Sequence, residues 1–431
     1  MRRATILATS VLAFAPGAAP ARPAPAPPAN PYVVVFDDGA VPDVGARVDT
    51  LQRALGFTSK LRYSSALDGF AADLTDAQAA QLAATPGVAF VHPDTTISMA
   101  GTSTLAAGET VPAGIRRIGA VAGTEAHAAS GAGVAVLDTG IDLANRDLAA
   151  VSGTNCIKPG TAAADDNGHG THVAGTIAAR NSGSGVVGVA PGTTVYAVKV
   201  LNAKGTGTLS QILCGINWVT ANAAALNIKI ANMSIAGLGM SDNACGATNK
   251  DAEHKAICSS VAAGVTYIAA AGNSGANFAT SVPAAYPEVL TVTAMSDSDG
   301  LPGGKGATPS CKKGEKDDTY ATYSNYAVAA TEQAHAIAAP GTCVVSDAPG
   351  GRTAIYYGTS QAAPHVAGAA ALCIDDGGIG GPCAGLSPAQ IVQRLRADAA
   401  ASATLTNGFA GDPLRPVAGR FYGYAVAAGT Y

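Results

Sequence analysis

Three polar residues stand where a chain can present catalytic groups. Asp138 ends the apolar stretch Gly133 to Asp138, and His169 and Ser360 each begin a helical pattern beside glycine-containing turns. A serine hydroxyl is a poor nucleophile until an imidazole accepts its proton, and the imidazole needs a carboxylate to hold its tautomer and stabilise its charge. Together the three residue types indicate nucleophilic catalysis by serine.

Each of these residues also has an ordinary structural interpretation. Asp138 could form a turn, His169 could sit beside a helix cap, and Ser360 could be an N-cap. Two further histidines, His172 and His365, lie inside apolar helical runs and are expected to be packed. The pair His169-x-x-His172 does not match the zinc motif HExxH. The joint presence of aspartate, histidine and serine favours catalysis.

The elements that must position these residues follow an alternating pattern from about residue 111. The expected strands are 133–138, 194–201, 229–235, 266–273 and 289–295, and the expected helices are 171–179, 209–224, 256–265, 360–374 and 387–399. Apolar strands joined by helices predict an α/β fold, with a mostly parallel sheet covered by helices on both faces. Ligands of such sheets bind beyond the carboxyl ends of the strands.

A smaller unit is expected before this one. Residues 31–97 contain three strand patterns (32–36, 68–74 and 88–94) and two helical ones (41–55 and 75–87), which predicts a small α+β domain. We expect residues 98–110 to link it to a catalytic domain at 111–431.

Residues 1–30 are expected to be a signal peptide and a Pro/Ala linker, because an apolar stretch follows Met1-Arg2-Arg3 and prolines follow in turn. Small residues at 19 and 21, or at 24 and 26, could frame the cleavage site. A buried first helix is the alternative. No other apolar run is long enough for a membrane anchor, so the protein is expected to be secreted.

The composition argues against a protein that binds nucleic acid or anionic lipid. Only 13% of the 431 residues are charged and the net charge is −4, which offers no basic surface for nucleic acid or anionic lipid. The eight cysteines fit an oxidising compartment. Eight cysteines allow 105 pairings, so the sequence does not determine the connectivity. The intervening loops favour pairing Cys245 with Cys258 and Cys373 with Cys383, and Cys311 with Cys343 and Cys156 with Cys214 would be the remainder. Buried free thiols at Cys214 and Cys373 are the alternative.

Five motifs carry a resemblance to a known family. In chain order they are VAVLDTGID, HGTHVAGTIAA, NMSIAG, AAAGNSG and GTSQAAPHVAG. They resemble the subtilisin-like serine proteases, whose catalytic residues follow the order Asp, His, Ser. The resemblance covers roughly residues 111–400. Residues 31–97 look like the inhibitory propeptide of such enzymes.

The resemblance implies a secreted serine endopeptidase that works through an acyl-enzyme and is processed from its own precursor. Asp138 would orient His169, His169 would act as general base and then acid, and Ser360 would attack the scissile carbonyl. Asn273 would donate its side-chain amide to the oxyanion. In the family the residue after the nucleophile is commonly methionine, whereas Gln361 stands here.

The family also implies where substrate binds. An extended peptide would pair with two segments, Gly205 to Leu209, including Thr206 and Gly207, and Ser234 to Gly237, including Ile235. Ala236 stands where the family usually has glycine. The segments IAAAGN and SVPAAYP, expected to wall the main pocket, contain no carboxylate. We therefore expect an apolar or aromatic residue before the cut, since a cation would need a countercharge.

No organic cofactor is implied, but the resemblance suggests structural calcium. Asp147 follows Asp138 at the family's ligand spacing, and the loop from Ala179 to Val186, with Asn181, has the length of the calcium loop. Ser182 replaces the usual amide-bearing ligand, and an unliganded surface loop is the alternative.

The expected partners are protein or peptide substrates and the protein's own propeptide, and we expect a monomer. Two rival functions make different demands on the sequence. An α/β-hydrolase esterase would need a G-x-S-x-G elbow and the order Ser, Asp, His, and neither is present. A catalytically silent binding protein would be favoured by loss of a catalytic residue, and none is lost.

Overall fold

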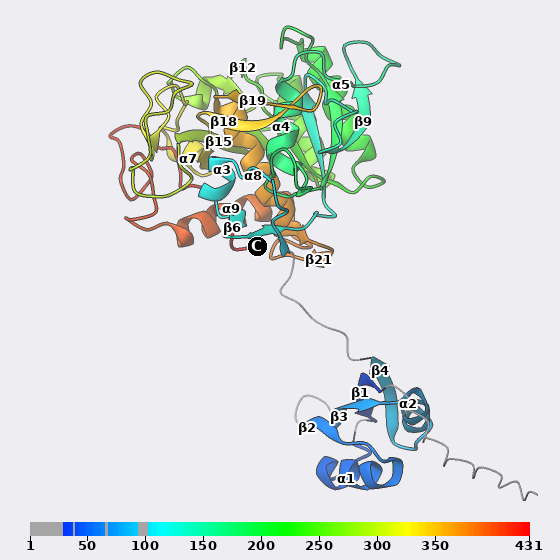
Figure 1. Cartoon of the computed structure of the whole chain (residues 1–431). Coiled ribbons are helices and arrows are strands. Elements are labelled where there is room, and N and C mark those ends of the chain that lie inside the picture. The colour runs from blue at the N-terminus through cyan, green and yellow to red at the C-terminus, as the bar shows by residue number, and fades with distance from the viewer. Residues whose placement is uncertain (1–28, 38, 65–67, 94–101) are drawn as a thin grey trace, which may run out of the picture. The chain divides into compact units, whose positions relative to one another are not determined.

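The computed structural model describes residues 29–37, 39–64, 68–93 and 102–431 (Figure 1). The chain divides into two compact units, Met1–Ser98 and Met99–Tyr431. The expected signal segment, its cleavage site and the start of the expected 98–110 linker lie outside the described residues. The two units are described separately below.

The first unit is a four-stranded sheet with two helices. Its strands β1 (Asn30–Phe36), β2 (Ser59–Ser64), β3 (Asp68–Leu74) and β4 (Val88–Pro93) are ordered β2-β3-β1-β4, and every pairing is antiparallel. Helices α1 (Val44–Leu55) and α2 (Asp76–Ala83) pack on it. Thr75 caps α2, and its hydroxyl accepts a hydrogen bond from the Gln78 amide. The sequence missed β2, whose SKLRYS has few apolar residues because its side chains are mostly exposed.

The second unit is built on an eight-stranded sheet with the order β16-β15-β13-β11-β8-β10-β9, in which β17 also pairs with β15. All pairings are parallel except that of β16. The strands are β8 (Gly133–Asp138), β9 (Ala149–Asn155), β10 (Thr194–Lys199), β11 (Ile228–Met233), β13 (Thr266–Ala270), β15 (Val289–Ser296), β16 (Thr319–Tyr320) and β17 (Ala336–Pro340).

Helices cover both faces of this sheet, which confirms the expected fold class. Side chains of β8 alternate between two cores: Val134 and Val136 pack in one, with α4 (His169–Ala178) and α8 (Thr359–Ile374), and Ala135 and Leu137 pack in the other, with α5 (Leu209–Asn222) and α6 (Ala252–Ala262). Helix α9 (Pro388–Ser402) joins the first core. The continuous apolar runs of these strands follow from burial on both sides.

Shorter elements complete the second unit. They are β5 (Thr102–Thr104), α3 (Ala113–Arg117), β6 (Val121–Ala122), β7 (Glu125–His127), β12 (Gly237–Leu238), η1 (Phe278–Thr280), β14 (Ser281–Val282), α7 (Ala330–Gln333), β18 (Val344–Ala348), β19 (Arg352–Tyr356), β20 (Asp375–Asp376) and β21 (Ile379–Gly380).

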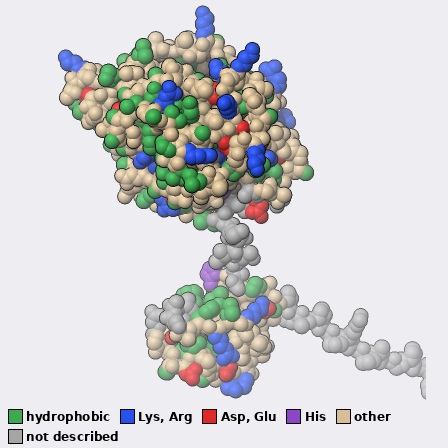
Figure 2. All heavy atoms as spheres, turned by 90° about the vertical axis from the view of Figure 1, so that its left-hand side faces the viewer, with side chains coloured by type: hydrophobic (Ala, Val, Ile, Leu, Met, Phe, Trp, Pro, Cys, Tyr) green, Lys and Arg blue, Asp and Glu red, His purple; other side chains and the backbone are tan. Residues whose placement is uncertain are grey.

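All eight cysteines form disulfides, and the four expected pairings are confirmed. Among the described residues, no helix is both long and apolar enough to cross a membrane. On the face of the second unit shown in Figure 2, Lys and Arg side chains are scattered among other residues and form no continuous basic patch.

Candidate active site

Asp138 and His169 meet at the carboxyl end of β8. Asp138 is the last residue of that strand and is fully buried, whereas His169 is the first residue of α4. The His169 ring nitrogen Nδ1 lies 2.8 Å from Oδ1 and 2.9 Å from Oδ2 of Asp138. This contact fixes Nδ1 as the protonated nitrogen beside the carboxylate, so Nε2 is left to accept a proton.

The close approach of α4 to β8 depends on a glycine. A Cβ on Gly170 would collide with the carbonyl oxygen of Gly140 and would stand 3.2 Å from the Cβ of Asp138. The Gly170 amide donates a hydrogen bond to Thr139 Oγ1 at 2.9 Å. The start of α4 is therefore held against the strand end by backbone contact.

Two charged residues not singled out by the sequence brace the loop before His169. Asp165 accepts hydrogen bonds from the amides of Gly168 and Thr171, at 2.9 and 3.0 Å, and from the Thr171 hydroxyl. The buried Lys199 ammonium donates to the Thr139 carbonyl at 2.5 Å and to Asp166 at 2.6 Å. Both residues hold the loop by hydrogen bonds to its backbone and side chains. No local pattern in the sequence marks residues with this role.

The charge of Asp138 sets the protonation of His169. Burial alone would lower the pKa of His169, but the charge of Asp138, the hydrogen bond to it and the charge of Asp165 outweigh burial, and the pKa is raised above its ordinary value. The imidazolium is thus stabilised in the site. Such stabilisation is what a general base needs when it takes a proton during a reaction.

Ser360 is the second residue of α8 and lines the same cavity as His169. Its hydroxyl donates a hydrogen bond to the carbonyl of Ser234 at 2.9 Å. The Ser234 hydroxyl in turn donates to the carbonyl of Ser360 at 2.7 Å. No hydrogen bond between Ser360 and His169 occurs in the described part of the chain, because the serine hydroxyl donates to Ser234 instead. Catalytic hydrogen bonds often form only when substrate binds.

Asn273 faces Ser360 from the loop after β13. Its Oδ1 accepts hydrogen bonds from the amide and hydroxyl of Thr359, at 2.7 and 3.0 Å, so the side-chain NH₂ remains to donate. Asn325 holds this loop by accepting hydrogen bonds from the amides of Ser274 and Ala276, each at 3.0 Å. Asn273 Nδ2 and the amide at the start of α8 are both donors that could bind an oxyanion.

These groups open into one cavity with a volume of about 920 Å³. The two segments expected to pair with substrate, 205–209 and 234–237, both line it, and Ala236 is exposed there. Asp138 is fully buried behind His169. The structure thus brings together all the residues that the sequence assigned to substrate and all the catalytic candidates.

The sequence analysis did not predict that the start of α6 lines the cavity. Residues 252–255 were expected to be loop, but Asp251 caps α6 and the helix begins at Ala252, four residues earlier than predicted. Asp251 and Glu253 consequently line the cavity. The Asp-x-Glu spacing is a helix-start signal that could have been noticed, since acidic residues favour the first turn.

His172 and His365 are packed, as their apolar surroundings indicate. Both are fully buried. The ring of His172 stacks on Tyr356 with centroids 4.4 Å apart, and burial lowers its pKa to about 3. Burial lowers the pKa of His365 to about 4, and its Nδ1 bonds the Gln361 carbonyl at 2.9 Å. Neither histidine lines the cavity.

A group of acidic oxygens lies at the expected cation loop. Asp147 Oδ2 and Glu109 Oε1 are buried and have no hydrogen-bond partner among the described residues. Burial, and next the charge of Glu109, raise the pKa of Asp147. Ser182 donates its hydroxyl to Asp147 Oδ1 at 3.2 Å, and Asn181 Oδ1 accepts from the Ala106 amide at 2.7 Å. Glu109 was not a sequence candidate.

Comparison with known proteins agrees with this geometry. The model of the "Subtilase family" matches residues 129–415, and that of "Peptidase inhibitor I9" matches residues 31–100. The chain belongs to the subtilase family. It is 36% identical over 309 residues to Subtilisin E of Bacillus subtilis (strain 168), covering 70% of each chain. It is 37% identical over 271 residues to Subtilisin of Bacillus pumilus, covering 62% of this chain and 85% of that protein.

A solved structure supports the same subtilase fold. It is described as a cold adapted subtilisin-like serine proteinase, shares 26% identity and a TM-score of 0.53, and aligns with 75% of this chain and 99% of its own. The protein is therefore a subtilisin-like serine endopeptidase with an inhibitory propeptide domain.

Proposed function

We propose that Asp138, His169 and Ser360 form the catalytic triad of this subtilase. The contact of His169 Nδ1 with both oxygens of the buried Asp138, in the cavity that also holds Ser360, carries the proposal. His169 Nε2 takes the hydroxyl proton as Ser360 attacks the scissile carbonyl, and then gives it to the leaving amine. Water then attacks the acyl-enzyme. His169 takes a proton from this water and returns it to the Ser360 oxygen as the acyl group leaves.

The test is the variant Ser360→Ala, for which we expect kcat on an unstructured protein to fall by about 10⁶, the magnitude known for subtilisin. Ser259→Ala is the matched control, because Ser259 is an α6 residue outside the cavity whose hydroxyl donates to the Lys255 carbonyl. Full activity of Ser360→Ala would overturn the proposed triad.

Asn273 is proposed to stabilise the oxyanion together with the Ser360 amide. Because its Oδ1 is held by Thr359, its NH₂ is oriented before substrate arrives. Removal of one such donor lowers kcat by about 10² to 10³, a magnitude that comes from a subtilisin. Asn273→Leu should show that loss with little change in KM. A change confined to KM would contradict the assignment.

The proposed substrates carry an apolar or aromatic residue directly before the cut. The segments 266–273 and 281–287 contribute Ala270, Gly272, Val282 and Pro283 to the cavity lining, and none of these offers a countercharge for a cation. Cleavage of peptides that differ only in this residue tests the preference. Faster cutting after Lys or Arg than after Leu or Phe would contradict it.

We propose that the protein is secreted and removes its own propeptide. The match of residues 31–100 to an inhibitor family and the apolar N-terminal sequence support this. The Ser360→Ala precursor, purified from a host free of other proteases, should keep its propeptide attached. Appearance of the mature-length chain would refute self-processing.

A structural calcium ion is proposed at Glu109 and Asp147. Two buried carboxylate oxygens without hydrogen-bond partners among the described residues fit a divalent cation that prefers oxygen ligands, and backbone carbonyls of the 179–186 loop could add to them. A chelator should lower Tm, and Asp147→Asn should reduce that effect. An unchanged Tm in chelator would exclude the ion.

A further inference from the structure

The end of the cavity formed by α6 contains a carboxylate that catalysis does not use. Glu253 is only 8% exposed, yet its side chain lines the cavity. Its carboxylate takes part in no hydrogen bond or ion pair within the described ranges of the chain. Burial, followed by the charge of Asp251, raises the pKa of Glu253 to about 7. An acid in this position is costly unless something offsets its charge.

The neighbouring carboxylate, Asp251, already has hydrogen-bond partners for both of its oxygens. Its Oδ1 accepts hydrogen bonds from the amides of Glu253 and His254, at 3.0 and 3.2 Å, and its Oδ2 accepts from the Tyr286 hydroxyl at 2.6 Å. Asp251 therefore acts as the cap of α6 and as an anchor for Tyr286. Glu253 is the acid left to face a ligand.

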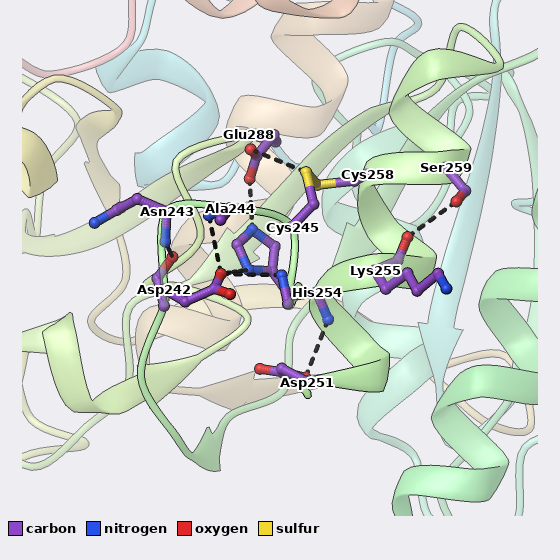
Figure 3. Close-up of a disulfide and its surroundings, with 12 residues drawn as sticks. Asp242, Asn243, Ala244, Cys245, Asp251, His254, Lys255, Cys258, Ser259 and Glu288 are labelled. Atoms are coloured by element: carbon purple, nitrogen blue, oxygen red, sulfur yellow. Dashed lines mark hydrogen bonds and ion pairs between the residues drawn. A yellow bond between two sulfur atoms is a disulfide. The ribbon is translucent and has the colours of Figure 1, made fainter. Parts of the chain in front are cut away.

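The residue after Glu253, His254, has contacts on several sides (Figure 3). His254, the next residue, is fully buried, with Nε2 2.8 Å from Glu288 and Nδ1 3.3 Å from Asp242. Its ring stacks on Tyr286 with centroids 4.1 Å apart. The Cys245–Cys258 disulfide ties the preceding loop to the helix. These contacts fix the first turn of α6, and with it the backbone at Glu253.

The cavity is large enough to hold more than the side chain before the cut. Its volume of about 920 Å³ is near the upper end of the range for drug-sized ligands. In an extended peptide, alternate side chains point to the same side, and residues rise by about 3.3 Å each. A substrate paired with segments 205–209 and 234–237 can therefore place a second side chain in the same cavity.

We propose that Glu253 selects a substrate with a lysine or arginine side chain upstream of the residue directly before the cut. The cavity is also lined by the apolar residues Ile212, Ile235 and Val282, which suit the methylene stem of such a side chain, while the charged end pairs with Glu253. Arginine can bind a carboxylate through two parallel hydrogen bonds. The proposal rests on the endopeptidase function above and adds a second specificity to it.

The alternative is that Glu253 only stabilises the helix start. An acidic residue in the first turn interacts favourably with the helix dipole. That role would not require burial or a place in the cavity, and it would make no difference to which peptides are cut.

The test uses the mature enzyme and fluorogenic peptides with leucine fixed before the cut. Each of the four positions upstream of that leucine is varied in turn among Lys, Arg, Gln, acetyl-lysine and norleucine. At one position we expect kcat/KM for Lys or Arg to exceed that for norleucine about tenfold or more, the size of a charge-assisted contact. Acetylation of the lysine should remove the gain, and this arm needs no variant.

Glu253→Gln should remove the preference, so that kcat/KM for the Lys peptide falls to about that for the norleucine peptide. Glu125→Gln is the matched control, since Glu125 is exposed on β7 and lies outside the cavity. Equal rates for Lys and norleucine at every position, or a Gln preference equal to that for Lys, would overturn the inference alone. If the enzyme cuts none of the peptides or an unstructured protein, the proposed function itself falls.

Discussion

At the scale of single residues, the acid–base properties of the site depend on one buried carboxylate. Asp138 is fully buried and contacts His169 Nδ1 through both oxygens. Without its charge, burial would be the largest influence left on the pKa of His169. The active base is the neutral imidazole, so the pKa of His169 sets the acid limb of the pH profile.

For Asp138→Asn we therefore expect two effects. The kcat should fall by about 10⁴, the loss seen when the equivalent aspartate of a serine protease becomes an amide. The acid limb of the remaining kcat/KM should lie at a lower pH than in the unaltered enzyme, because the charge of Asp138 no longer raises the pKa of His169. A pH profile of both enzymes measures this, and an acid limb that does not move would contradict the role of Asp138.

Gln361 gives a second residue-scale prediction. It follows the nucleophile, is 2% exposed, and lies beside Gly358, where an added Cβ would stand 3.0 Å from Gln361 Oε1. An amide cannot be oxidised, whereas a methionine there would gain a polar sulfoxide oxygen in a packed site. We expect Gln361→Met to lose activity faster in peroxide than the unaltered enzyme.

The comparison needs one control, because the structure places Met240 in the cavity with 62% exposure. Met233 and Met295 are fully buried. Both forms should therefore also be measured with Met240→Leu. Equal decay of activity in that background would show that Gln361 confers no tolerance.

At the scale of elements, the active site is a junction of strand ends and helix starts. The contact between α4 and β8 leaves no space for a side chain at Gly170. Gly170→Ala should cost about 1–3 kcal/mol of stability, the range for overpacking, and should lower kcat more than a surface change of equal stability cost. Thermal unfolding and kinetics on the same samples measure both. Unchanged activity with a lowered Tm would show that the site tolerates the displacement.

Buried strands of this fold can be predicted from the sequence more readily than exposed ones. Strands such as β8 and β15 are buried on both faces, and their apolar runs identify them. Strand β9, AAVSGTN, lies at the sheet edge and is partly exposed, so its polar composition hid it.

The residues of the active site also differ in how readily the sequence predicts them. Asp138, His169 and Ser360 stand in local motifs that can be read directly. Glu253 has no such motif, because it reaches the cavity only through the packing of α6 against the rest of the unit. Tertiary contacts of this kind leave no local pattern.

At the scale of the whole molecule, the precursor combines an enzyme with a separate inhibitor-like unit. The first unit has its own core, which includes Val34, Phe36, Phe70 and Leu82, all at most 1% exposed. It also has a complete four-stranded sheet. We therefore expect residues 31–97 to fold when made separately.

Residues 31–97 added to the mature enzyme should inhibit it at equimolar concentration. The match of residues 31–100 to the peptidase inhibitor family supports this expectation, and the fragment ends with the residues that follow β4 in the sequence. The control is Phe70→Ala in the same fragment: Phe70 is fully buried, and its loss should cost about 3–5 kcal/mol, enough to unfold a small domain. Titration of peptidase activity with each fragment measures the effect. Inhibition by the unfolded variant as strong as by the folded one would show that the terminal segment alone suffices, and full activity with both would refute the inhibitory role.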